Sequence, residues 1–162
     1  MKQEFNKLQS PMKIGRLSIP NRVVMTAMGT NIAAAGGGVN DDVIAYYEAR
    51  ARGGVGLIIT EVTRVADGAG GGEPCQLAAR RPSDISELQK LANAIHKYDS
   101  KLFVQLQHPG REASPFVTGE QPVAPSAIAN PMGGRRHAAR SFDRGMRGAG
   151  AEVRYRCNVC LS

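Results

Sequence analysis

Three short runs of apolar and β-branched residues divide the chain up to residue 107. Residues 22–27 (RVVMTA) and 55–60 (VGLIIT) are continuous runs, which is the pattern of strands buried on both faces. The run at 101–107 (KLFVQLQ) alternates instead, so its two faces differ. The sequence therefore predicts three strands, the third with amides on one side. In that strand we expect helix-facing side chains at Leu102, Val104 and Leu106, and the opposite orientation at Phe103, Gln105 and Gln107.

Two amphipathic segments separate these strands. The first is predicted to begin after Asn40, a good N-cap residue, and to end at Gly53–Gly54. The second is predicted to begin with Ser83 or Asp84 as its cap, and Glu87 stands three residues after Asp84 as in a capping box. The apolar stripes consist of Val43, Ile44, Tyr47 and Ala51 in the first helix, and of Ile85, Leu88, Leu91 and Ile95 in the second.

A small hairpin is predicted ahead of the first strand, because Ile14 and the pair Leu17 and Ile19 flank the two-residue turn Gly15–Arg16. Strand, helix, strand, helix and strand follow it along the chain. That order is typical of a parallel sheet with right-handed helical connections. The sequence therefore predicts the α/β class.

The segment from residue 135 onward has a different character. Residues 135–162 hold seven Arg against Asp143 and Glu152, a net charge of +5 within the +7 of the whole chain. No apolar periodicity continues there, so we expect a disordered tail and place a domain boundary between 1–134 and 135–162. One hypothesis for the protein is accordingly a non-catalytic binding module whose basic tail contacts nucleic acid or another anionic surface. Its support is thin, because only Phe142 and Tyr155 interleave aromatic rings with the arginines.

Composition narrows the remaining classes. No stretch approaches the 18 consecutive apolar residues of a membrane span, and the N-terminal residues lack the apolar region of a secretory signal, so we expect a cytoplasmic protein. The spacing of Cys157 and Cys160 is that of a C-x-x-C motif, but only His137 and the distant Cys75 could complete a zinc site. We therefore predict no metal.

Two glycine-rich stretches, 36–38 and 67–74, invite comparison with phosphate-binding loops. A dinucleotide fingerprint joins a strand directly to a helix N-terminus, whereas ten residues separate Gly72 from Ser83. We expect both stretches to be mobile loops. His96 is expected at the surface of the second helix. His108 follows the third strand at its carboxyl end, where α/β proteins bind ligands, and this position also favours a functional role for Gln105.

The order and spacing of several motifs carry a resemblance. PMKIGRLSIPNRVVMTAMGTN is followed by GGVGLIITE, then by KLFVQLQHPGREA and QPVAPSAI. From about Leu8 to Gly134 the chain resembles the N-terminal part of the old yellow enzyme family, the NADH:flavin oxidoreductases that include 2,4-dienoyl-CoA reductases and enoate reductases. The resemblance implies a TIM (β/α)8 barrel that binds FMN, of which this chain holds about three β/α units and a leading hairpin.

The resemblance also implies which residues meet the flavin. The cofactor contacts carried over are Thr26, Ala27, Met28 and Gly29 after the first strand, Val62 after the second, and Gln105 in the third. Gln105 would pair with the pyrimidine edge of the flavin, which suits an amide because it both donates and accepts hydrogen bonds. Asn31 falls in a loop that faces substrate, and His108 and Arg111 would give local support. The family's substrate-holding polar residues lie beyond position 134, so no catalytic residue is assigned.

The implied activity is hydride transfer from NAD(P)H through FMN to an activated alkene of the enoate or dienoyl type. We expect this chain to be a truncated, inactive fragment that retains FMN weakly, with a tail that resembles out-of-frame translation. The alkene, the preference for NADH or NADPH and the oligomeric state stay open.

Overall fold

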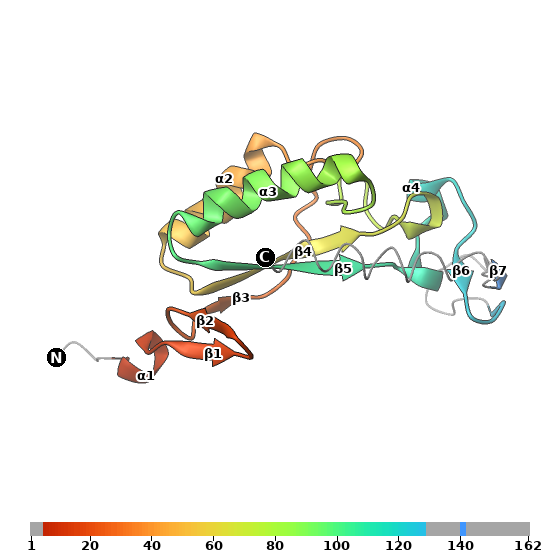
Figure 1. Cartoon of the computed structure of the whole chain (residues 1–162). Helices are drawn as coiled ribbons and strands as arrows, with labels where there is room; N and C mark the ends of the chain where they lie inside the picture. Colours follow the sequence, from red (N-terminus) through yellow and green to blue (C-terminus); the bar gives the residue numbers. More distant parts are fainter. Residues whose placement is uncertain (1–4, 129–139, 142–162) are drawn as a thin grey trace.

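The computed structural model describes residues 5–128 and 140–141 (Figure 1). Helices and strands alternate along most of it. The helices are α1 (Asn6–Gln9), α2 (Asp41–Arg52), α3 (Pro82–His96) and α4 (Pro115–Thr118), with 3-10 turns η1 (Gly68–Gly70) and η2 (Gly110–Glu112). The strands are β1 (Met12–Ile14), β2 (Leu17–Ile19), β3 (Val24–Met25), β4 (Leu57–Arg64), β5 (Lys101–Gln107), β6 (Val123–Ala124) and β7 (Arg140–Ser141).

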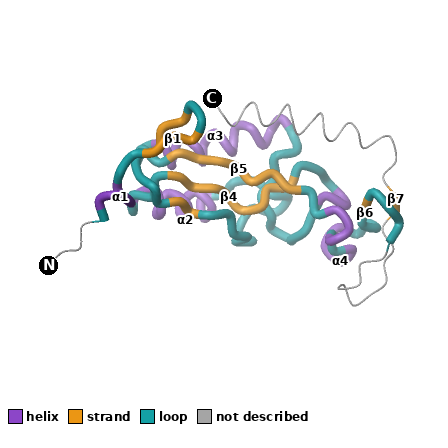
Figure 2. The backbone as a smooth tube through the Cα atoms, turned by 90° about the horizontal axis from the view of Figure 1, so that it is seen from below, coloured by secondary structure: helices purple, strands orange, loops and turns teal. Residues whose placement is uncertain are grey.

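A three-stranded parallel sheet in the order β3-β4-β5 forms the centre of the described chain. The connection from β3 to β4 passes through α2, and that from β4 to β5 passes through α3. Both helices lie over the same face of the sheet, and the view from below looks onto the strands (Figures 1 and 2). The predicted α/β class and the two helical crossovers are confirmed, as is the leading hairpin β1–β2.

The core lies between the helices and the sheet. Tyr47 of α2 is 1% exposed, while Leu91 and Ile95 of α3 and Ile58 of β4 are fully buried. Leu102 of β5 packs against this cluster. Burying such side chains contributes about 1.5–3 kcal/mol each, so this interface supplies much of the folding free energy.

The first two strands differ from their predicted extents. β3 holds only Val24–Met25, and Val24 is 37% exposed, because β3 is an edge strand of the sheet within the described residues. The expectation that 22–27 is buried on both faces is therefore wrong. β4 runs on to Arg64, beyond the predicted end at Thr60. The extension contains Glu61 and Thr63, which are fully buried like Thr60 before them, and the hydrogen bonds of these residues offset part of the cost of burying them.

The start of α3 also differs from its prediction. Arg81 is the N-cap residue and Pro82 the first helical residue, a position that suits proline. Asp84 lies inside the first turn, where its carboxylate accepts hydrogen bonds from the backbone N–H groups of Arg80 (2.9 Å) and Arg81 (3.0 Å). Glu87 takes no part in this cap. The predicted cap at Ser83 or Asp84 and the predicted pairing of Asp84 with Glu87 are therefore wrong.

The second glycine-rich stretch is more buried than expected for a loop. It forms η1, and Ala69 and Gly70 are almost inaccessible to solvent. His96 is exposed, as predicted. Within the Arg-rich segment, β7 pairs in parallel with β6. The C-x-x-C pair, His137 and nearly all of the expected tail lie outside the described residues. The described part contains no helix long and apolar enough to cross a membrane.

Candidate functional site

The carboxyl ends of β3, β4 and β5 meet at one edge of the sheet, because the three strands are parallel. Thr26 to Gly29 directly follow β3. Val62, near the end of β4, is the register partner of Gln105 on β5. The fold therefore brings Val62 and Gln105 side by side on adjacent strands. The residues that follow β3 lie at the same edge of the sheet, on the other side of β4.

Gln105 is the exposed residue of β5. Leu102 points to the helices and packs on the core, so strand alternation turns Gln105 to the opposite face, as predicted. Its backbone N–H donates to Thr60 Oγ1 at 3.4 Å, while its side-chain amide makes no hydrogen bond to any other described residue. The amide is thus available to a ligand on the face that α2 and α3 do not cover.

The loop after β3 presents Thr26, Met28 and Gly29 to solvent, with Ala27 half-buried. Met28 is 62% exposed, an unusual state for so large an apolar side chain. Gly29 lies against the second glycine-rich loop, since a Cβ built on it would stand 3.0 Å from Glu73 Oε1. A side chain at position 29 would therefore require Glu73 to move.

Asn31 has a positive φ of 56°, a left-handed conformation that asparagine tolerates better than most residues. Its Oδ1 accepts a hydrogen bond from the Cys75 backbone N–H at 2.8 Å. The residue is exposed, but its side-chain oxygen is engaged with the second loop. Asn31 thus joins the two loops, and its expected position facing substrate stays a prediction.

Sequence reasoning did not assign a role to Glu61. Its side chain is fully buried, and Oε2 accepts from Thr30 N (2.6 Å), Thr30 Oγ1 (2.8 Å) and Asn31 N (3.4 Å). The available signal was an acid that directly ends the apolar run VGLIIT. A carboxylate within β4 thereby holds the loop that follows β3.

Gln76 is a second buried polar residue that the pattern did not reveal. Its Oε1 accepts from Gly72 N at 2.9 Å, and its Nε2 donates to Gln107 Oε1 at 2.7 Å and to Val62 O at 3.2 Å. One amide therefore ties the second loop to the ends of β4 and β5. Nothing in the local sequence distinguishes this glutamine from a surface residue.

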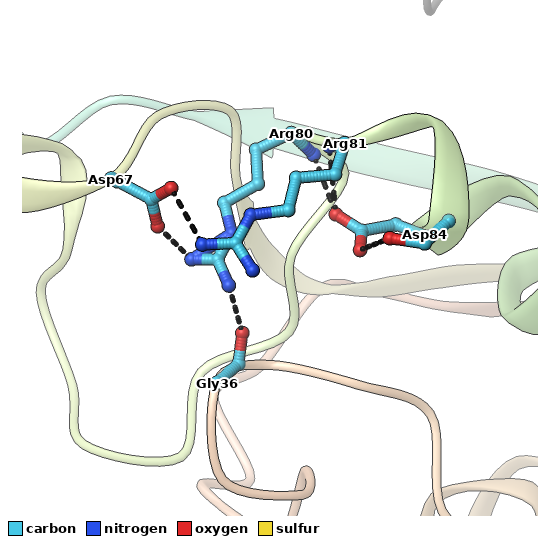
Figure 3. A network of polar contacts seen from close by, with 6 residues as sticks. Gly36, Asp67, Arg80, Arg81 and Asp84 are labelled. Atoms are coloured by element: carbon cyan, nitrogen blue, oxygen red, sulfur yellow. Dashed lines mark hydrogen bonds and ion pairs between the residues drawn. The ribbon is translucent and has the colours of Figure 1, made fainter.

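A polar network secures the outer part of the same edge (Figure 3). The Asp67 carboxylate forms ion pairs with Arg80 and Arg81, and Arg80 also donates to Gly36 O at 2.6 Å. The network joins the loop before α2 to the loop before α3. Because both arginines pair with Asp67, we interpret the network as support for the loops at the carboxyl edge of the sheet.

Two ionisable groups near the strand ends have shifted pKa values. Burial, and then the nearby positive charge of Arg80, lowers the pKa of the Arg64 guanidinium. Burial lowers the pKa of His108, whose Nδ1 accepts from the Gly110 N–H at 3.0 Å. That bond requires an unprotonated Nδ1, so the ring is neutral near pH 7 and supports the turn after β5.

The donor set at this edge fits one part of a flavin and does not resemble a metal site. Among the described residues, no three His, Cys, Asp or Glu side chains lie close enough to hold a metal ion. The unbonded amide of Gln105 suits the uracil-like edge of an isoalloxazine, which both donates and accepts hydrogen bonds. Val62 beside it offers an apolar contact for the ring. The arrangement is therefore compatible with FMN, and the assignment of Gln105, Val62 and the loop from Thr26 to Gly29 as its contacts stays a prediction.

Comparison with known proteins gives consistent matches. The sequence model of the NADH:flavin oxidoreductase / NADH oxidase family matches residues 7–150, beyond the boundary at 134 that the pattern suggested. An NADH oxidase of Thermoanaerobacter brockii is 46% identical over 125 residues, which are 76% of this chain and 19% of that protein. A cinnamate reductase of Clostridium sporogenes is 37% identical over 136 residues, 79% of this chain and 20% of that protein.

Solved structures match the fold of this chain as well. The crystal structure of old yellow enzyme from Pichia sp. AKU4542 superimposes with a TM-score of 0.84 at 21% identity, covering 96% of this chain and 43% of that one. Such old yellow enzymes are TIM barrels, so the β/α units described above correspond to part of a barrel. The chain spans about a fifth of the length of the first two relatives. On the family match and these identities, the chain belongs to the NADH:flavin oxidoreductase / NADH oxidase family of FMN-dependent oxidoreductases.

Proposed function

We propose that this chain supplies the ring-binding part of an FMN site in an ene-reductase. The whole enzyme would transfer hydride from NADH or NADPH through FMN to an activated alkene of the enoate or dienoyl type. The observation that carries the proposal is the exposed side-chain amide of Gln105, which has no hydrogen bond among the described residues and lies beside Val62 on the uncovered face.

The names of the relatives support this reaction class. Cinnamate and acrylate are carboxylates conjugated to a carbon–carbon double bond, and they name a reductase of Clostridium sporogenes and an NADH oxidoreductase of Vibrio harveyi that are 37% and 40% identical to this chain. Conjugation makes the β-carbon electrophilic, so such alkenes accept hydride. We assign the same substrate class to the enzyme to which this chain corresponds.

FMN, when bound, supplies the hydride chemistry itself. The chain's own residues bind and orient the ring. The Gln105 amide fixes the pyrimidine edge through a donor and an acceptor, and Val62 contacts the ring without competing for its polar atoms. The loop from Thr26 to Gly29 closes the site on the side of β3, and Asn31, two residues beyond that loop, faces the substrate.

On this proposal the assigned residues contact the ring, and none of them is assigned to the phosphate. We therefore propose that the 162-residue chain alone binds FMN weakly and has no reductase activity. Riboflavin, which lacks the phosphate, should bind with an affinity within a few-fold of that of FMN. AMP, which carries a phosphate but no flavin, should not bind at the same place.

A titration of the 15N-labelled chain followed by NMR tests this proposal, because it detects binding in the millimolar range. FMN and riboflavin should both shift the amide signals of Met28, Gly29, Val62 and Gln105, and AMP should leave them unchanged. Shifts confined to other residues, or none at millimolar flavin, would contradict the proposed site. Stoichiometric flavin in the purified chain would contradict the proposed weakness of binding.

A further inference from the structure

β4 is irregular at the point where it reaches the candidate site. Its register with β5 shifts between Ile59 and Val62, so the strand carries one extra residue relative to its partner. The backbone of Glu61, inside this irregular stretch, is fixed from both sides. Its N–H donates to Tyr47 Oη at 2.7 Å, and its carbonyl accepts from the hydroxyl groups of Thr60 (3.1 Å) and Thr63 (2.9 Å).

This anchoring leaves the Glu61 side chain directed at another segment. Oε2 accepts three hydrogen bonds from Thr30 and Asn31, thirty residues away in the sequence. Two of the donors are backbone N–H groups at consecutive residues. A charged acceptor that receives several such bonds restrains the local backbone more strongly than a neutral one.

The restrained residues continue the loop assigned to the flavin. Thr30 follows Gly29 directly, and Asn31 holds the left-handed backbone conformation with φ at 56°. Asparagine adopts that conformation more readily than most residues but less readily than glycine, so tertiary hydrogen bonds help to hold it. Glu61 and the bond from Cys75 N–H to Asn31 Oδ1 supply that support.

We propose that Glu61 is a positioning residue, which sets the conformation of the loop from Thr26 to Gly29 and so determines how the chain meets the flavin ring. The inference rests on the proposed function for the identity of the ligand. The hydrogen bonds of Glu61 are independent of the proposed function, because they are present in the chain without ligand. The residue acts through the loop, because its carboxylate is fully buried and bonded to Thr30.

Glu87 offers a matched control. It is also a carboxylate that holds a loop, since its Oε2 accepts from the Val39 backbone N–H at 2.9 Å. It lies on α3 and holds the end of the loop that leads into α2, nine residues beyond Thr30. Loss of Glu87 should therefore loosen a different turn and leave the residues assigned to the flavin in place.

The experiment compares Glu61→Gln, Glu61→Ala and Glu87→Gln in the full 162-residue chain. The first readout is hydrogen exchange at the amides of Thr30 and Asn31 without flavin. Exchange should rise about tenfold or more in Glu61→Ala and less in Glu61→Gln, because an amide oxygen still accepts but carries no charge. Glu87→Gln should raise exchange at Val39 alone.

The second readout is the dissociation constant for FMN from the NMR titration. Affinity should fall about tenfold in Glu61→Ala, less in Glu61→Gln, and remain unchanged in Glu87→Gln. Thr30→Val gives a test from the other side of the contact. It removes only the hydroxyl donor at a half-buried position, so it keeps the fold even if Glu61→Ala unfolds, and it should weaken FMN binding to a smaller extent.

The outcomes separate the two proposals. Unchanged exchange at Thr30 and Asn31 in the Glu61 variants would overturn the positioning role. Faster exchange with unchanged FMN affinity would overturn its link to the site. If the parent chain binds no flavin, the proposed function fails, and the exchange data alone decide whether Glu61 fixes this loop.

Discussion

The two faces of the β3–β4–β5 sheet differ in burial and in polarity. On the face covered by α2 and α3, Ile58, Leu91 and Ile95 are fully buried and form the core. On the opposite face, Gln105 is exposed with an amide that has no hydrogen bond among the described residues. The contrast teaches that one face supplies folding free energy, while the other presents a polar side chain that the core does not use.

Glu61 connects the core on the covered face with the candidate site. The Glu61 N–H donates to Tyr47 Oη on the helix side, and its carboxylate holds Thr30 at the edge of the candidate site. Stability and site geometry should therefore be coupled at Glu61 and independent elsewhere. Substitutions on each face can test this division.

The largest effect is expected on the covered face, for Leu91→Ala. Leu91 is fully buried in the core, so its truncation should lower the free energy of unfolding by about 3 kcal/mol. Urea denaturation followed by circular dichroism measures the change. Ile85→Ala on the same helix is the control, because Ile85 is 37% exposed and should cost less than about 1 kcal/mol. Equal losses for the two variants would refute the assignment of the core.

On the open face, Gln105→Leu should weaken FMN binding about 5- to 150-fold if, as proposed, its amide pairs with the ring edge. The free energy of unfolding should change by no more than about 0.5 kcal/mol, because the side chain is exposed. The NMR titration and urea denaturation measure the two quantities. Gln89→Leu, at an exposed glutamine of α3, is the control that should not affect FMN. An unchanged dissociation constant would remove Gln105 from the site.

Tyr47 tests the bridge between the faces. The pKa of its hydroxyl is raised to about 12, chiefly by burial; the bond from the Glu61 N–H opposes the rise, and the charge of Glu61 adds to it. The folded state thus holds this proton more tightly than the unfolded state, whose tyrosines titrate near 10. Stability should be intact below about pH 10 and fall by up to about 1.4 kcal/mol per pH unit between about 10 and 12.

Urea midpoints at several pH values measure this dependence on pH. Tyr47→Phe should be less stable at pH 8, because the Glu61 N–H loses its acceptor, and should show a shallower decline between pH 10 and 12. An equal decline of stability in Tyr47→Phe and in the parent would show that other groups cause the dependence on pH.

The smallest effect is expected for Asn40→Ala at the start of α2. Asn40 Oδ1 accepts from the Val43 N–H at 2.9 Å, and Nδ2 donates to Ile32 O at 2.8 Å. Losing the cap should lower the free energy of unfolding by about 1 kcal/mol. Asn40→Asp keeps the acceptor and loses the donor, so it should lie between the parent and Asn40→Ala in urea denaturation. A loss for Asn40→Asp as large as that for Asn40→Ala would show that the bond to Ile32 is the more important one.

The sequence alone was sufficient for the order of the hairpin, the three strands and the two long helices between residues 12 and 107, for the cap at Asn40 and for the orientation of Gln105. These features depend on residues close together in the chain: an N-cap and its helix, or the alternation of side chains along one strand. The family resemblance was visible for the same reason, because its motifs are contiguous segments.

Only the tertiary structure decided which polar residues are buried and what they hold. Glu61 reaches Thr30 across about thirty residues, so the local pattern could not name its partner, and nothing near Gln76 in the sequence indicates that it joins Gly72 to Gln107. The extension of β4 through buried Glu61 and Thr63 followed from hydrogen bonds that hydrophobicity does not encode. A periodic pattern reports the burial of apolar surface, whereas a buried polar group is stable only with partners, and the fold determines where those partners lie.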